Sequence, residues 1–267
     1  MSMSERKGCL ALIGGSEDRR YEKEVLKRLI EINDAKIVAV VPTATSYPRE
    51  CADTYIEAFE DLGIKDINIV DVRYVDEANE DEYVDMLEDA DLIYFTGGDQ
   101  CRLSEILLGS KLLKKVFERF SKGTTIAGTS AGAAAAAERM IFSWRDDECL
   151  YHKGCVNDGV GFGFIKKTLV DTHFLERGRI PRLALMLAAG PEHMAIGVSE
   201  DTMGIVYPDN TMEVVGSGVI TVLIKQPNFY SNYQSKAEDD NITTEGIRMT
   251  FVAPGMKFDL SKKKVIQ

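Results

Sequence analysis

Residues 128–132, Gly-Thr-Ser-Ala-Gly, constrain the fold of this chain more than any other stretch. They follow residues 124–127, a short β-branched run that predicts a buried strand, and precede residues 133–137, an alanine run that favours a helix. A strand, a sharp turn with a serine at its apex and a helix together make the nucleophile-elbow pattern G-x-S-x-G. We expect the turn to hold Ser130 in an unfavourable backbone conformation and to leave no room for side chains at the two glycines. A turn that only packs a helix against a sheet is the alternative.

The composition narrows the classes of protein to which the chain can belong. A formal net charge of -11 argues against nucleic-acid binding, which needs a basic face. No apolar run approaches the ~18 residues of a membrane-spanning helix, and the apolar stretch at residues 8–13 is too short for a signal-peptide core. We therefore expect a cytoplasmic protein with no membrane partner and no nucleic-acid partner.

Metal and disulfide chemistry are not expected from the sequence. The five cysteines are odd in number and lack C-x-x-C spacing, which predicts neither a disulfide nor a zinc site. No group of His, Asp and Glu has the spacing of metal ligands, and a serine mechanism needs no metal or other cofactor.

Strand and helix patterns alternate through the first half of the chain. Strands are expected at residues 9–13, 36–41, 67–72, 92–95 and 124–127, and helices at 19–32, 49–62, 77–90, 100–108 and 110–120. This alternation predicts a doubly wound, mainly parallel sheet with helices on both faces. Such sheets place their sites at the carboxyl ends of the strands, where the glycine-rich turns of this chain fall.

The second half of the chain changes character. Residues 141–164 predict loops with short strands, and a strand at 168–170, a helix at 179–189 and a strand at 194–198 follow. An antiparallel meander is expected at 204–207, 212–215 and 219–224, then a polar surface loop at 227–245 and a final pair of short strands. No linker divides the chain, so residues 1–267 are expected to form a single α/β catalytic domain with a C-terminal antiparallel extension.

A serine nucleophile needs a base, which is usually a histidine. The chain has three histidines. His152 falls in an irregular region, and His193 lies in a turn before a strand. His173 directly follows a predicted strand end, the position from which α/β enzymes present catalytic groups. We therefore favour His173 as the base for Ser130.

The base also needs an acidic partner, and three carboxylates are candidates: Asp171, Glu200 and Asp201. Glu200 is favoured because it ends a predicted strand, whereas Asp171 suits substrate contact at least as well. The resulting order, serine, histidine, acid, differs from the serine, acid, histidine order of α/β-hydrolases. A lipase or esterase of that fold is therefore disfavoured.

Three arginines, at positions 177, 179 and 182, closely follow His173. Arg179 and Arg182 share one helix face by their i,i+3 spacing. Because guanidinium groups bind carboxylates with two parallel hydrogen bonds, this pattern favours an acidic group on the substrate. Pairing of the arginines with acids of the same chain is the alternative.

Several short motifs together resemble those of one peptidase family. In chain order they are residues 13–15 (Ile-Gly-Gly), 41–44 (Val-Pro-Thr-Ala), 95–100 (Phe-Thr-Gly-Gly-Asp-Gln), 128–133, 171–174 (Asp-Thr-His-Phe) and 197–201 (Gly-Val-Ser-Glu-Asp). The set resembles the cyanophycinase branch of the family that also contains the aspartyl dipeptidase peptidase E. The resemblance implies a class I glutamine amidotransferase-like (flavodoxin-like) sandwich with serine at the elbow, and it suggests a homodimer.

The resemblance also assigns roles to particular residues. It implies Ser130 as nucleophile, His173 as general base and Glu200 as the acid that orients the base. The backbone amides of Gly98 and Ala131 would form the oxyanion hole. The positions that would contact the β-linked aspartyl-arginine unit are Gln100, Asp171, Thr172, Arg177, Arg179 and Arg182.

The reaction that the resemblance implies is exopeptidase hydrolysis of cyanophycin, multi-L-arginyl-poly-L-aspartate, to β-Asp-Arg dipeptides. Thr172 departs from the cyanophycinase pattern, which usually has glutamine at this position, and its shorter side chain loses reach toward the substrate. A peptidase E-like dipeptidase for α- or β-aspartyl peptides is therefore kept as an alternative. A family member that only binds a small amino-acid ligand or a partner chain is a third hypothesis.

Overall fold

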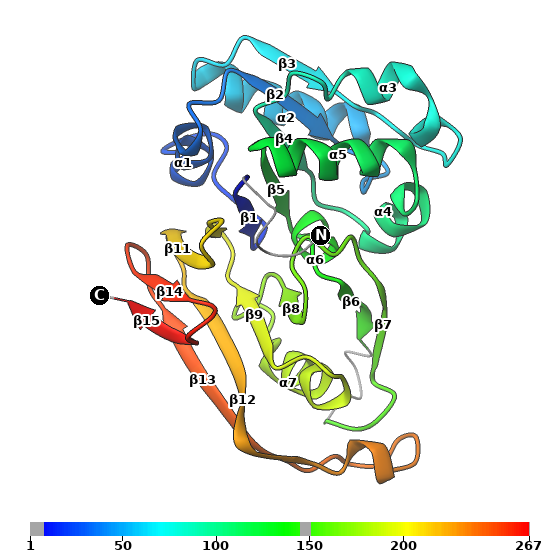
Figure 1. Ribbon diagram of the computed structural model, residues 1–267, viewed down its shortest axis with the longest axis vertical. Coiled ribbons are helices and arrows are strands. Elements are labelled where there is room, and N and C mark those ends of the chain that lie inside the picture. Colours follow the sequence, from blue (N-terminus) through cyan, green and yellow to red (C-terminus); the bar gives the residue numbers. More distant parts are fainter. Residues whose placement is uncertain (1–7, 145–150, 267) are drawn as a thin grey trace.

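The computed structural model describes residues 8–144 and 151–266, and a mainly parallel sheet forms its first half (Figure 1). The parallel strands are β1 (Leu10–Ile13), β2 (Ile37–Val41), β3 (Asp66–Ile69), β4 (Leu92–Phe95) and β5 (Thr125–Thr129). They lie side by side in the order β3-β2-β4-β5-β1, and each neighbouring pair is parallel. The predicted α/β fold is confirmed.

Helices cover both faces of this sheet, and strands β1, β4 and β5 are therefore buried on both sides. The helices are α1 (Glu24–Ile32), α2 (Pro48–Asp61), α3 (Asp81–Asp85), α4 (Gln100–Leu107) and α5 (Lys111–Lys122), with a 3-10 turn η1 at Glu77–Asn79. Along β1, Ala11 and Ile13 belong to a core shared with α1 and α2, whereas Leu10 and Leu12 belong to one shared with α4 and α5. The period of two along a strand thus produces two hydrophobic cores.

Two of the predicted helices are shorter than expected. The Asp18 carboxylate accepts hydrogen bonds from the backbone N–H groups of Arg20, Tyr21 and Lys23, which holds this segment in a turn and delays the start of α1. The helix expected over residues 77–90 is divided into η1 and α3. The other helices of this half lie close to their predicted positions.

The second half of the chain extends the first sheet and builds another. Antiparallel strands β10 (Thr202–Val206), β11 (Thr211–Gly216), β14 (Lys257–Asp259) and β15 (Lys264–Ile266) continue the first sheet beyond β1. A second sheet has the order β13-β12-β9-β8, with β8 at Thr168–Asp171, β9 at Met194–Val198, β12 at Ile220–Ser231 and β13 at Thr244–Val252. The remaining elements are α6 (Ala131–Ala135), α7 (Ile180–Ala189), η2 (Tyr233–Ser235) and a hairpin of β6 (Arg139–Trp144) and β7 (Val156–Val160).

Strand β12 corrects two predictions for the second half. The expected meander would pair it with β11, but it pairs with β9 and β13 instead. A buried strand pattern predicts the strand but not its neighbour, because pairing depends on residues distant in the sequence. The stretch expected to be a polar loop at 227–245 contributes its first residues to β12 and its last to β13, which form a long hairpin at one side of the molecule (Figure 1).

One cysteine also departs from expectation. Cys155 is disulfide-bonded, so the prediction that no disulfide forms was wrong. An odd number of cysteines excludes complete pairing but not a single bridge. The prediction that residues 1–267 form one catalytic domain stays a prediction.

Candidate active site

The serine turn has the conformation that its sequence predicts. Strand β5 ends at Thr129, α6 begins at Ala131, and Ser130 between them has φ 50° and ψ -107°. A side chain at Gly128 would overlap the backbone of Gly132, and one at Gly132 would come within 2.5 Å of the Phe95 carbonyl oxygen. The two glycines therefore permit the sharp turn that presents the Ser130 hydroxyl at the carboxyl end of the sheet.

His173 reaches this hydroxyl from the second sheet. The residue follows β8, has φ 45°, and donates its backbone N–H to the Gly14 carbonyl oxygen at 2.8 Å. Its ring lies against Gly15, where any side chain would overlap the imidazole. The Nε2 atom is 2.9 Å from the Ser130 Oγ atom, and His173 is buried. A glycine turn after β1 thus makes room for the histidine beside the serine.

Glu200 contacts the other ring nitrogen of His173. It follows β9, and its Oε1 atom lies 2.6 Å from His173 Nδ1. The hydrogen bond from His173 lowers the pKa of Glu200, so the carboxylate stays ionised. An ionised carboxylate accepts the Nδ1 proton, which leaves Nε2 free to accept the proton of the Ser130 hydroxyl.

The other two carboxylates that the sequence left open have other partners. Asp201 accepts hydrogen bonds from the backbone N–H of Asp18 at 2.9 Å and from the Ser217 hydroxyl at 2.8 Å. Asp171 is buried and binds Arg182 through both of its oxygens, with Arg182 Nε 2.7 Å from Oδ2. The structure therefore brings Glu200 to the histidine.

The arginines differ in their surroundings. Arg182 is buried against Asp171, as the alternative of pairing within the chain anticipated. Arg179 lies 3.6 Å from the Asp171 carboxylate and donates to the Thr172 carbonyl oxygen at 2.7 Å. Arg177 is exposed. Arg182 is therefore part of a buried ion pair, whereas the Arg177 side chain is open to solvent.

A polar cavity of about 300 Å³ joins these groups. Its lining includes every residue that the sequence predicted for the site except Glu200: Gly98, Gln100, Ser130, Ala131, Asp171, Thr172, His173, Arg177, Arg179 and Arg182. Residues 141–144 of β6 also line it, and sequence reasoning missed them because it treated this region as irregular. Gln100 connects the two sets, since its Nε2 atom donates to the carbonyl oxygens of Ile141 and Phe142.

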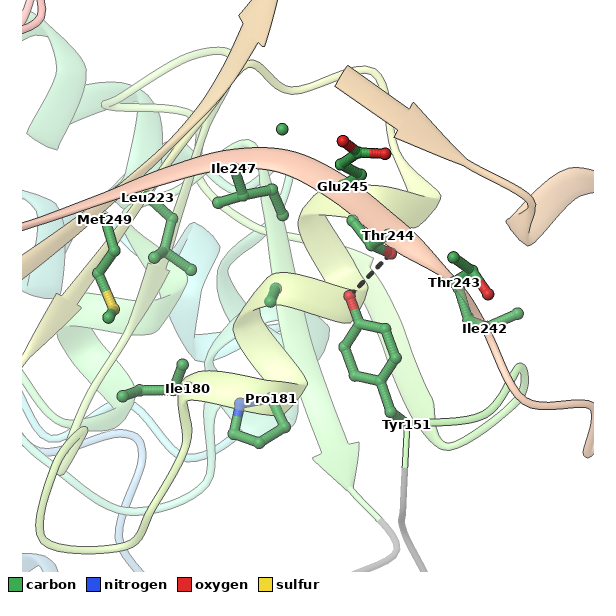
Figure 2. Close-up of a pocket in the computed structure, with 12 residues that line it drawn as sticks. Tyr151, Ile180, Pro181, Leu223, Ile242, Thr243, Thr244, Glu245, Ile247 and Met249 are labelled. Carbon is green, nitrogen blue, oxygen red and sulfur yellow. Dashed lines mark hydrogen bonds between the residues drawn. The ribbon is translucent and has the colours of Figure 1, made fainter. Parts of the chain in front are cut away.

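A larger, more apolar cavity lies elsewhere, between the start of α7 and β13 (Figure 2). It measures about 870 Å³, and the Tyr151 hydroxyl hydrogen-bonded to Thr244 at 2.9 Å lies at one end of it. Neither Ser130 nor His173 lines this cavity. This cavity is the larger of the two, but the smaller one is the candidate active site because it contains the reactive side chains.

Two other features are absent from residues 8–144 and 151–266. In these ranges no helix is long and apolar enough to cross a membrane. The same ranges hold no group of three His, Cys, Asp or Glu side chains placed to bind a metal ion.

Comparison with protein families identifies one match. The model of peptidase family S51 matches residues 10–215. A cyanophycinase of Geminocystis herdmanii (strain PCC 6308) is 32% identical over 257 residues, which cover 95% of this chain and 94% of that protein. A cyanophycinase of Nostoc sp. (strain PCC 7120 / SAG 25.82 / UTEX 2576) is 29% identical over 263 residues, with 97% and 88% covered.

Solved structures share the fold. A peptidase from an acI-B1 Actinobacterium superposes with a TM-score of 0.71 at 23% identity, covering 96% of this chain and 98% of that chain. A putative peptidase E from Listeria monocytogenes EGD-e gives a TM-score of 0.52 at 15% identity, covering 79% of this chain and 98% of that chain. At these identities the likeness concerns the fold alone.

Proposed function

This chain belongs to peptidase family S51 and is a peptidase, and we propose that it is a serine-type exopeptidase that hydrolyses cyanophycin to β-Asp-Arg dipeptides. The observation that carries the proposal is the chain of contacts from Ser130 through His173 to Glu200, with distances of 2.9 and 2.6 Å. These distances suit proton transfer from the hydroxyl to the imidazole. The substrate is taken from the cyanophycinases that the chain resembles.

The geometry supports an acyl-enzyme mechanism. The Ser130 oxygen attacks the scissile carbonyl carbon while its proton moves to His173 Nε2. Glu200 stabilises the imidazolium through its hydrogen bond to Nδ1. Collapse of the tetrahedral intermediate expels the amine, which takes the proton from His173, and a water molecule activated by the same histidine then hydrolyses the ester.

The oxyanion of each tetrahedral intermediate needs donors beside Ser130. We propose the backbone N–H groups of Gly98 and Ala131, both of which line the cavity with the serine. Gly97 supports this placement, because a Cβ atom built on it would be only 3.3 Å from Ser130 Cβ. The turn after β4 therefore lies directly against the nucleophile.

Substrate recognition is assigned to other residues that line the cavity. Arg177 is exposed and can bind a substrate carboxylate, whereas Arg182 and Asp171 already bind each other. We propose that this pair acts as a rigid support for Arg179 and Thr172 at the cavity wall. Gln100 and the β6 carbonyl groups that it binds would contact the arginyl part of the dipeptide unit.

A peptidase E-like dipeptidase activity is the second candidate. The cavity of about 300 Å³ is at the small end of ligand pockets, which suits a free aspartyl dipeptide as well as the end of a polymer. Thr172, buried and shorter than glutamine, favours the same alternative.

Incubation of the purified protein with insoluble cyanophycin tests the substrate. Mass spectrometry should detect β-Asp-Arg with the wild type and not with Ser130→Ala. No release from cyanophycin together with cleavage of α- or β-aspartyl dipeptides would replace the polymer by the dipeptides. Failure to cleave any of these substrates would contradict both activities.

A further inference from the structure

The segment from the last residue of β1 onward, residues 13–18, contacts Ser130, His173 and the neighbour of Glu200. The Ile13 carbonyl oxygen accepts the backbone N–H of Ser130 at 3.0 Å, and the Gly14 carbonyl oxygen accepts that of His173 at 2.8 Å. The Gly15 carbonyl oxygen accepts the N–H of Asp201, the neighbour of Glu200, at 2.9 Å. Three elements distant in the sequence are therefore fixed by one short stretch of backbone.

Glu17 in this segment is a buried carboxylate that the proposed reaction does not use. Only 4% of its surface is exposed. Its Oε2 atom accepts a hydrogen bond from the Thr129 hydroxyl at 2.6 Å, and its Oε1 atom accepts one from the Tyr94 hydroxyl at 2.9 Å and another from the Tyr55 hydroxyl. Three hydroxyl groups from β5, β4 and α2 thus meet at one carboxylate.

Two of the three donors are close to the nucleophile turn in the fold. Thr129 is the residue before Ser130, and Tyr94 is on β4, whose following turn carries Gly97 against Ser130. Burial, together with the nearby charge of Glu17, raises the pKa of Tyr94 and of Tyr55 well above the usual value. Both phenols therefore stay protonated and keep donating to Glu17.

Stability alone is a poor explanation for this arrangement. Removing a carboxylate from water is costly, and well-packed apolar side chains of similar size often stabilise a protein as well or better. Several hydrogen bonds to one carboxylate do, however, fix the relative positions of the elements that carry the donors. Ser130 needs such fixing, because its φ of 50° and ψ of -107° persist only if the surroundings enforce them.

We propose that Glu17 is a positioning residue that holds Ser130 in its reactive conformation through the hydroxyl groups of Thr129 and Tyr94. The inference rests on the proposed function, since it takes Ser130 as the nucleophile. Glu17 is not among the residues that line the cavity with Ser130, and it acts through Thr129, which precedes the serine, and through Tyr94 on β4.

The rate at which a fluorophosphonate probe labels Ser130 tests this role without depending on the substrate. Glu17→Gln keeps the shape of the side chain but removes its charge, and labelling should slow about 10-fold or more, since small displacements of a reacting group have effects of this size. A smaller slowing would overturn the inference. Absence of labelling in the wild type, or equal labelling of Ser130→Ala, would overturn the nucleophile and the inference together.

Glu192 provides a matched control. It is also buried and pairs with Arg139 at 3.1 Å, but it precedes β9, whereas Glu200 follows that strand. Glu192→Gln should lower the free energy of unfolding and leave the labelling rate unchanged. If both variants slow labelling equally, loss of a buried carboxylate acts through general destabilisation and the positioning role is contradicted.

Thr129→Val distinguishes positioning from folding. It tests the proposal even if Glu17→Gln does not fold. Valine keeps the size of threonine but cannot donate to Glu17, so this variant alone should also slow labelling of Ser130. The double variant Glu17→Gln/Thr129→Val tests whether Glu17 acts through Thr129. If it does, adding Glu17→Gln to Thr129→Val should slow labelling by a smaller factor than Glu17→Gln slows it in the wild type. Fully additive effects, or normal labelling of Thr129→Val, would contradict that route.

Discussion

Two buried carboxylates, Glu17 and Asp171, are held in different ways near the Ser130–His173 pair. Glu17 accepts hydrogen bonds from three neutral hydroxyl groups, one of them on Thr129, the residue before Ser130. Asp171, two residues before His173, binds the guanidinium group of Arg182 through both of its oxygens and lies 3.6 Å from that of Arg179. The first carboxylate joins β4, β5 and α2 through neutral donors, and the second makes up one half of an ion pair.

The Glu17 region and the Asp171 region are therefore suited to different roles at the site. Hydroxyl donors on β4, β5 and α2 connect parts of the fold, so the Glu17 region suits the fixing of geometry. The Asp171 region concentrates charge near the cavity, but Asp171 and Arg182 already bind each other there. A substrate carboxylate therefore meets the exposed Arg177 more readily than Arg182.

Ser130→Ala removes the proposed nucleophile, near which both regions lie, and it should have the largest effect on activity. Turnover should fall by at least about four orders of magnitude, because removal of one triad member removes the covalent route. The free energy of unfolding should change by less than about 1 kcal/mol, since the side chain is small and lies at the cavity. Steady-state kinetics and urea unfolding measure the two quantities, and unchanged turnover would contradict the mechanism.

Arg182→Ala should show that the Asp171 region is an ion pair. The variant leaves a buried carboxylate with a weaker partner, and we expect a loss of about 3–5 kcal/mol in the free energy of unfolding. The double variant Asp171→Leu/Arg182→Met should be more stable than Arg182→Ala because it leaves no buried carboxylate without its Arg182 partner. A loss of substrate affinity in Arg182→Ala with normal stability would instead assign the arginine to the substrate.

Tyr55→Phe should have a smaller effect on the Glu17 region. Glu17 keeps two of its three hydroxyl donors, so the expected loss is about 1–2 kcal/mol in the free energy of unfolding. Probe labelling of Ser130 should stay near the wild-type rate because Tyr55 lies on α2, and Thr129 and Tyr94 still donate to Glu17 in this variant. Labelling as slow as in Glu17→Gln would mean that the region acts as one unit rather than through Thr129.

Asp18→Asn should produce the smallest effect, one that depends on pH. Backbone N–H groups, that of Lys23 foremost, lower the pKa of Asp18 from 3.8 to about 2. A pKa that is lower in the folded state adds stability above the unfolded value, so the wild type should exceed the variant above about pH 4. The difference should shrink as the pH falls toward 2, and a difference independent of pH would contradict this assignment.

Local patterns in the sequence predicted the parts of the site that depend on local geometry. The glycines at 128 and 132 and the position of His173 after a strand were sufficient to propose the serine and the histidine. Alternation of strands and helices predicted the parallel sheet. These features depend on neighbours within a few residues, which is where sequence patterns carry information.

Features that depend on distant partners were not predictable in the same way. Strand β12 pairs with β9 rather than β11, which no local pattern specifies. Glu17 lies in a polar run, residues 16–20, that is typical of a surface loop, yet it is buried among hydroxyl groups from three other elements. The Asp171–Arg182 pair was anticipated only as an alternative, because charge spacing does not distinguish an internal partner from a substrate.

Trapping the acyl-enzyme tests the central claim most directly. A short soluble cyanophycin fragment would be mixed with the protein, quenched rapidly in acid and digested for peptide mass spectrometry. The account predicts an acyl group on the peptide that contains Ser130, and none in Ser130→Ala. An acyl group on another residue, or release of dipeptide by Ser130→Ala at the wild-type rate, would contradict it.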